Sequence, residues 1–198
     1  MRKILLFIIV SIFTTIATYA QNYNPSPQLS IGVNAGVAVG TVSTYYPAAS
    51  ELTLKLTYPI AHSPASFTFS TGYTFYSSNQ GYDAGYSYGG FGFDYYSGGY
   101  SSGPVASFIP VMAGVKIYVA KRLFVKGEAG ASFNVNTYPQ DYTGKTTAFI
   151  YSPGAGYTLP LGYSRKNSFD FSLAYENRVE PGGGYTQVTF GAAFNFGL

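Results

Sequence analysis

Hydrophobic and polar residues alternate with a period of two in eight separate stretches of this sequence. In residues 28–40, QLSIGVNAGVAVG, the odd positions from 29 are Leu, Ile, Val, Ala, Val and Val, and the even ones are Ser, Gly, Asn, Gly, Ala and Gly. Successive side chains of a strand point to opposite faces, so this pattern predicts a strand with one apolar face. The other seven stretches are residues 51–58, 66–76, 109–119, 122–133, 149–159, 169–178 and 187–198.

The spacing of these strands favours an antiparallel barrel. The connections near 41–49, 77–107, 136–146 and 179–184 are long, and those near 59–65, 120–122 and 160–167 are short. An even number of strands, with long loops at one end and short turns at the other, is typical of up-and-down outer-membrane barrels. In such a barrel the termini and the short turns are periplasmic. A soluble, lipocalin-like barrel carries the same alternation, with its apolar face inside.

The charged residues decide between these two barrels. They make up 10% of the chain, and the eight within strands all fall on the less apolar face: Glu51, Lys55, Lys116, Lys126, Glu128, Asp170, Glu176 and Arg178. Lys or Arg facing lipid at mid-membrane costs about 2–4 kcal/mol, so a membrane barrel turns its charges inward. The same face is mostly Gly, Ser, Thr, Ala and Asn, which suits a narrow lumen. The sequence therefore predicts an all-β fold, an eight-stranded antiparallel up-and-down transmembrane β-barrel.

The inward charges predict a lumenal ion-pair network. The eight residues are four bases and four acids, and buried charges are costly unless they are paired. We expect the network to fill the lumen as a plug. In the segment RLFVKGEAGASF, Lys126 and Glu128 share one face. We expect both to contact Lys116 and Asp170 more than each other.

Tyrosines and prolines give two local expectations. Five tyrosines near strand ends predict the aromatic girdles of a membrane barrel: Tyr58, Tyr73, Tyr118, Tyr157 and Tyr175. Pro110 and Pro153 fall inside predicted strands, although proline cannot donate a ladder hydrogen bond. We expect Pro110 to mark the start of its strand and Pro153 to lie at a bulge.

Residues 1–20 have the layout of a secretory signal peptide. Arg2 and Lys3 precede an apolar stretch, Ile4 to Phe13, that is too short for a spanning helix of about 20 residues. We expect cleavage after Ala20, a linker at 21–27 and the barrel domain at 28–198. Without Arg2 and Lys3, nine of the 11 basic residues remain against eight acidic ones, so the charge does not indicate a nucleic-acid partner.

Several segments carry a family resemblance. The sequence IPVMAGVKIYVAKRLFVKGEAGASF, with YSPGAGY, FDFSLAYENR and FGAAFNFGL, resembles small outer-membrane β-barrel domain proteins of the Bacteroidota type, OmpA/OmpX-like or PorT-like. The resemblance implies a location in the outer membrane of a Gram-negative cell envelope. It also implies contact with outer-membrane lipid and insertion by the barrel-assembly machinery. It carries over no catalytic residue.

The residues give no support to catalysis. His62, in PIAHSPA of the first short turn, is the only histidine of the chain. No cluster of His, Cys, Asp or Glu has metal-ligand spacing. The Gly-rich GGFGFD lacks the strand–turn–helix context of a phosphate-binding loop. We therefore expect no enzymatic activity, no metal and no cofactor.

The loop near 77–107 is a candidate recognition surface. Its aromatic residues are spaced by Gly and Ser, a composition typical of adaptable binding loops: Tyr82, Tyr86, Tyr88, Phe91, Phe93, Tyr95, Tyr96 and Tyr100. A flexible loop that shields the surface or folds into the barrel mouth is the alternative. The predicted function is an integral outer-membrane barrel with a structural or surface-interaction role and a surface or envelope protein as partner. The alternatives are a barrel component of an export or surface-assembly apparatus, or a small gated pore.

Overall fold

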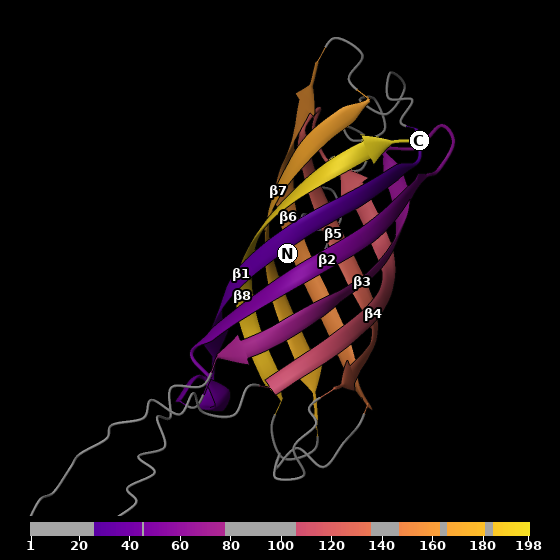
Figure 1. Ribbon diagram of the computed structural model, residues 1–198. Coiled ribbons are helices and arrows are strands. Elements are labelled where there is room, and N and C mark those ends of the chain that lie inside the picture. Colours follow the sequence, from indigo (N-terminus) through magenta and orange to yellow (C-terminus); the bar gives the residue numbers. More distant parts are fainter. Residues whose placement is uncertain (1–25, 45, 78–105, 136–146, 163–165, 181–183) are drawn as a thin grey trace, which may run out of the picture.

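The chain forms a closed barrel of eight antiparallel strands (Figure 1). The computed structural model describes residues 26–44, 46–77, 106–135, 147–162, 166–180 and 184–198. The elements are β1 (Gln28–Val39), η1 (Thr41–Thr44), β2 (Ala48–Pro59), β3 (Ala65–Ser77), β4 (Ala106–Tyr118), β5 (Leu123–Asn134), β6 (Thr147–Leu161), β7 (Asn167–Val179) and β8 (Tyr185–Gly197). The predicted fold class is confirmed.

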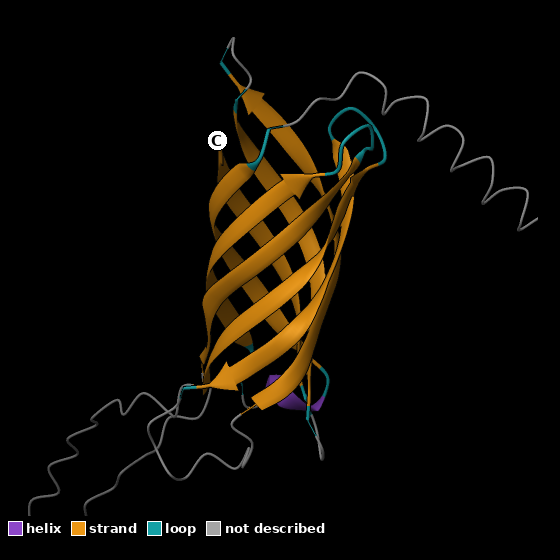
Figure 2. Ribbon diagram, turned by 90° about the vertical axis from the view of Figure 1, so that its right-hand side faces the viewer, coloured by secondary structure: helices purple, strands orange, loops and turns teal. Residues whose placement is uncertain are grey.

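Each strand pairs with the next in sequence, and β1 closes the barrel against β8. That closing ladder runs from Gln28↔Gly197 to Val39↔Thr186. The turns 60–64 and 119–122 lie at one end, here called the short-turn end, together with the end of β6, the start of β7 and the C-terminus (Figure 1). The opposite end, here called the loop end, carries η1 (Figure 2). Among the described residues, no helix is long and apolar enough to cross a membrane.

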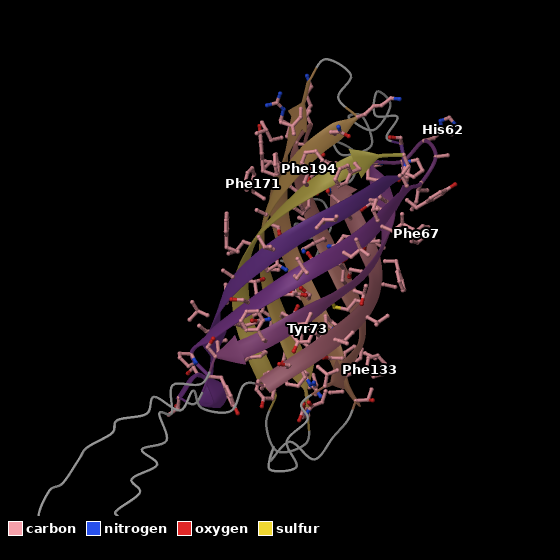
Figure 3. All side chains as sticks on the ribbon, in the orientation of Figure 1. His62, Phe67, Tyr73, Phe133, Phe171 and Phe194 are labelled. Atoms are coloured by element: carbon pink, nitrogen blue, oxygen red, sulfur yellow. The ribbon has the colours of Figure 1, made fainter. Side chains whose placement is uncertain are left out.

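The barrel is apolar outside and polar inside. Val33 on β1, Phe69 on β3 and Leu173 on β7 point outward and are 60%, 54% and 58% exposed. Phe67 and Phe171 project from the outer surface in the same way (Figure 3). Soluble proteins keep such side chains in the core. This orientation is the reverse of a lipocalin-like barrel.

Pro110 and Pro153 interrupt the ladder without shifting its register. Pro110 lies inside β4, which begins at Ala106, so the expectation that it starts the strand is wrong. The β3–β4 register is the same on both sides of it, and pairing is missing only opposite Gly72 and Tyr73. Pro153 interrupts the β6–β7 ladder in the same way. The expected bulge at Pro153 is wrong, because a bulge inserts an extra residue and this register is unbroken.

Four of the five predicted girdle tyrosines point outward. Tyr58, Tyr73, Tyr157 and Tyr175 are between 37% and 61% exposed. Tyr118 is 7% exposed and faces the lumen, so its assignment to the girdle is wrong. The reason is the phase of β4: an even-numbered residue lies on the same face as Lys116.

Gly156 gives a test of how tightly the lumen is packed. It lies opposite Phe124 in the β5–β6 ladder, and a Cβ there would overlap the Phe124 ring and the Phe171 carbonyl oxygen. We expect Gly156→Ala to lower the free energy of unfolding by about 1–3 kcal/mol, the usual cost of overpacking. Urea unfolding of the refolded barrel measures it.

Gly127→Ala is the matched control, because a Cβ at Gly127 would meet nothing within 4 Å. We expect this variant to be unchanged or more stable by up to about 1 kcal/mol. Equal destabilisation by the two variants would contradict the packing described here.

The charged lumen as the candidate functional site

All eight charged residues predicted to face the lumen point into it. Five are buried: Glu51, Lys116, Glu128, Glu176 and Arg178. The side chains of Lys55, Lys126 and Asp170 are 20%, 13% and 16% exposed. The strands bring these residues together in three layers along the barrel. The charged groups have different kinds of partner in each layer.

The short-turn layer consists of Lys116, Tyr118, Phe124, Thr158 and Asp170. Lys116 Nζ lies 2.6 Å from Asp170 Oδ2, and the Thr158 hydroxyl donates to Asp170 Oδ1 at 2.6 Å. The Tyr118 hydroxyl lies 3.1 Å from Thr158 Oγ1. Lys116 Nζ also lies 4.1 Å from the centre of the Phe124 ring, within cation–π range. This layer places a bonded ion pair against aromatic rings at the short-turn side of the lumen.

The middle layer joins two lysines to one glutamate. Lys55 Nζ lies 2.9 Å and Lys126 Nζ lies 3.7 Å from the same oxygen, Glu128 Oε2. The expected contacts of Lys126 and Glu128 with Lys116 and Asp170 are wrong, since those two residues pair with each other. Lys55 reaches Glu128 across the lumen from β2 to β5. Lys55 and Glu128 therefore meet because the sheet curves into a barrel, and not because their strands are adjacent.

Two acids of the middle layer are bonded to amides instead of bases. Asn34 Nδ2 donates to Glu51 Oε2 at 2.7 Å, and Gln187 Nε2 donates to Glu176 Oε1 at 2.7 Å. Each amide lies directly opposite its acid in the ladder, as Asn34↔Glu51 and Glu176↔Gln187. Sequence reasoning missed both amides. Their polar type and inward phase were visible, but choosing them as partners required the register.

The loop-end layer is an aromatic cluster that holds an arginine. Its buried residues are Ala38, Ala49, Tyr76, Ala106, Phe108 and Tyr185. The ring centres of Tyr76 and Phe108 each lie 5.0 Å from that of Tyr185. The Arg178 guanidinium carbon lies 4.0 Å from the centre of the Phe108 ring, and Arg178 Nε lies 2.6 Å from Glu180 Oε1. Arg178 thus pairs with an acid beyond the end of β7, which the sequence interpretation did not include.

A small polar cavity lies in the lumen. Its volume is about 60 Å³, and its lining includes Lys55, Glu128, Ser70 and Asp170. The buried Ser70 hydroxyl has no hydrogen-bond partner among the described residues. One water molecule needs a cavity volume of at least about 10–15 Å³, so this cavity has room for a few water molecules. A solute of metabolite size does not fit.

The described residues give little material for catalysis. Within the described ranges, no group of three His, Cys, Asp or Glu side chains could hold a metal ion. His62 is exposed in the β2–β3 turn with a φ of 56° (Figure 3). The predicted recognition residues between Tyr82 and Tyr100, and the predicted signal peptide at 1–20, lie outside the described residues.

Comparison with known proteins identifies the fold. No protein-family model matches the sequence, and no curated protein matches it. Solved structures do match. The outer membrane protein Ail of Yersinia pestis, in a phospholipid bilayer nanodisc, has a TM-score of 0.51 and 16% identity over 87% of this chain and 100% of that chain. The crystal structure of Ail, the attachment invasion locus protein of Yersinia pestis, has a TM-score of 0.50 and 15% identity over 87% of this chain and 100% of that chain.

The fold is that of a small outer-membrane barrel. Identities of 15% and 16% show the architecture and leave the role of this protein to its own residues.

The short-turn layer gives a test of charge pairing. We expect Asp170→Asn to lower the free energy of unfolding by about 3 kcal/mol, because it leaves Lys116 buried without its carboxylate. The double variant Lys116→Met/Asp170→Asn is expected to be more stable than Asp170→Asn alone, since no charge remains unpaired. Urea unfolding of the refolded proteins measures both.

Lys121→Gln is the control, because it removes a charge from an exposed turn and is expected to change stability by less than about 0.5 kcal/mol. With Lys116→Met also measured alone, strictly additive effects of the Lys116 and Asp170 substitutions would contradict the pairing.

Proposed function

We propose that this protein is an integral outer-membrane β-barrel with a closed lumen, a structural or surface-interaction role and no catalytic activity. The observation that carries the proposal is the reversed distribution of side chains. Large apolar residues cover the outside of the barrel, while eight charged residues lie inside it. In a bilayer the apolar residues contact lipid and the charged residues stay in the polar lumen. In water the same arrangement would expose the apolar residues and still bury the charged ones, and both carry a free-energy cost.

The apolar surface is continuous around the barrel. Leu52 and Leu54 on β2, Phe75 on β3 and Phe190 on β8 are exposed on the same outer face as those named above. Soluble monomers rarely expose apolar patches larger than a few hundred Å². A bilayer covers such a surface on every side, which a single protein partner does not.

The outer membrane is the bilayer that fits a closed barrel preceded by a secretory signal peptide. Closed β-barrels satisfy every backbone hydrogen bond between strands, and in Gram-negative bacteria they reside in the outer membrane. The predicted signal peptide with cleavage after Ala20 provides export. Insertion is assigned to the barrel-assembly machinery. The Ail structure in a bilayer nanodisc is consistent with this assignment at the level of the fold.

The filled lumen supports a role other than large-scale transport. Eight strands enclose an interior that side chains largely fill. Here the ion pair of Lys116 and Asp170 and the aromatic cluster around Phe108 lie on either side of Glu128 along the barrel. The functional surface is then the outer rim, where the aromatic loop predicted to bind a surface or envelope partner begins after β3.

A small gated pore is the second candidate, and the lumenal cavity favours it. The cavity is lined by both acids and bases, so water and ions in it would meet balanced charge. A change in the Lys55–Glu128 pair would enlarge it. The role as a component of an export or surface-assembly apparatus stays a prediction from the resemblance.

Conductance separates a closed barrel from a pore. Refolded protein whose gel migration slows on boiling is expected to give no stable channels in planar bilayers, because the three layers occlude the lumen. The variant Lys116→Ser/Asp170→Ser/Lys55→Ser/Glu128→Ser/Phe108→Ala removes side chains from all three layers. Checked by the same migration shift, it is expected to conduct. Large stable channels from the unsubstituted protein would reject the plug and support the pore.

Loop replacement tests surface recognition. Residues 82–100 are replaced by a short Gly/Ser turn, and folding is checked by the boiling shift. We expect attachment, phage sensitivity or cross-linking to an envelope partner to be lost while the barrel stays intact. A matched replacement of residues 137–144 in the β5–β6 connection is the control. Unchanged behaviour on all three measurements would reject recognition by this loop.

A further inference from the structure

The connections at the two ends of the barrel differ in the charged residues of their sequences. The three connections at the short-turn end contain Lys121, Arg122, Arg165 and Lys166 and no acidic residue. The four connections of the loop end contain the acids Asp83, Asp94, Asp141 and Glu180 and the single base Lys145. Of the four bases at the short-turn end, the structure describes Lys121, Arg122 and Lys166, and all three are exposed.

Arg122 is held at the outer edge of this rim. Its Nη1 donates to the hydroxyl of Tyr157 at 2.9 Å, and its carbonyl accepts from Thr158 N at 2.8 Å. Tyr157 is one of the outward-facing tyrosines. The guanidinium is thereby directed along the outside of the barrel rather than into the lumen.

An apolar row lies next to this arginine on the outer surface. Leu123, Tyr157 and Phe171 are neighbours across β5, β6 and β7 in the ladder, and all three are exposed. Phe171 projects from the half of the barrel that also carries His62 (Figure 3). The surface at β5–β7 is therefore amphipathic, with cations at its edge and hydrocarbon beside them.

We propose that this basic rim, Lys121, Arg122 and Lys166 with Tyr157, binds the phosphate groups of anionic phospholipids in the leaflet at the short-turn end. The inference rests on the membrane location proposed above. The guanidinium and the ammonium groups supply the charge that a phosphodiester attracts. The Tyr157 hydroxyl accepts from Arg122, which leaves its own proton available for a phosphate oxygen. The apolar row contacts the acyl chains of the same lipid.

Phospholipid suits this surface better than other anions. Free phosphate or an acidic peptide would contact only the cations, whereas a phospholipid contacts both the cations and the outward-facing Leu123 and Phe171 beside them. A basic segment at an anionic membrane surface gains from each Lys or Arg, and the gain falls as salt screens it.

The test uses lipid retention on the folded full chain. Protein is refolded in mixed micelles of phosphatidylglycerol and phosphatidylcholine with identical acyl chains, and native mass spectrometry counts the lipids that stay bound. We expect several-fold enrichment of phosphatidylglycerol on the unsubstituted protein. The variant Lys121→Gln/Arg122→Gln/Lys166→Gln is expected to lose it, and Tyr157→Phe to reduce it.

Two controls separate this site from general charge and from general tyrosine effects. Lys145→Gln removes a base from the β5–β6 connection, and Tyr175→Phe removes the hydroxyl of another outward tyrosine. Both are expected to keep the enrichment. Equal enrichment in the triple variant would overturn the proposal. Loss of bound phosphatidylglycerol on adding millimolar glycerol phosphate would assign the site to free phosphates, which also overturns it.

Folding in phosphatidylcholine alone distinguishes a failure of the headgroup site from a failure of the membrane-barrel proposal. A boiling shift in neutral vesicles with no preference for phosphatidylglycerol rejects the headgroup site and leaves the membrane barrel standing. Failure to fold in either lipid rejects both.

Discussion

Closure of the backbone ladder between β1 and β8 is the constraint on which the rest of this structure depends. A sheet with free edges cannot lie in a bilayer, because each unpaired backbone group there costs several kcal/mol. Once the sheet closes, every residue faces either the surroundings or the lumen, with no third position. Alternating apolar and polar residues are thereby divided between the outside of the barrel and its lumen. The same closure makes Pro110 and Pro153 tolerable at local gaps, since the unbroken register on either side holds the strands together.

Enclosing charges in a narrow lumen makes partners necessary, and the chain meets this need in three chemical ways. Lys116 and Asp170 form an ion pair next to aromatic rings. Glu128 is shared by Lys55 and Lys126. Glu51 and Glu176 accept hydrogen bonds from the amides of Asn34 and Gln187 rather than from bases. Because the bonded groups occupy the lumen, the space left inside the barrel holds only a few water molecules.

A period of two in the sequence predicted the strands and their inward and outward faces. The even number of strands and the alternation of long and short connections predicted the closed barrel. The sequence could not predict which charges meet. Asn34 was recognisable as inward-facing, but its contact with Glu51 depends on the β1–β2 register. Arg178 was expected among the lumenal acids and instead pairs with Glu180, which lies beyond the strand. Which charged side chains meet across the lumen depends on the tilt and stagger of the strands. A local sequence pattern predicts neither of these.

Site-directed spin labelling tests the central claim most directly, because the chain has no cysteine and each label position is unique. Single cysteines at Val33, Val125 and Leu173 probe the outer face, and single cysteines at Ser132 and Ser172 probe the lumen. In vesicles, the outer set should be accessible to dissolved oxygen and shielded from a water-soluble nickel reagent. The lumenal labels should be poorly accessible to both. High accessibility of the outer set to the nickel reagent would show that this face meets water, and would contradict the account.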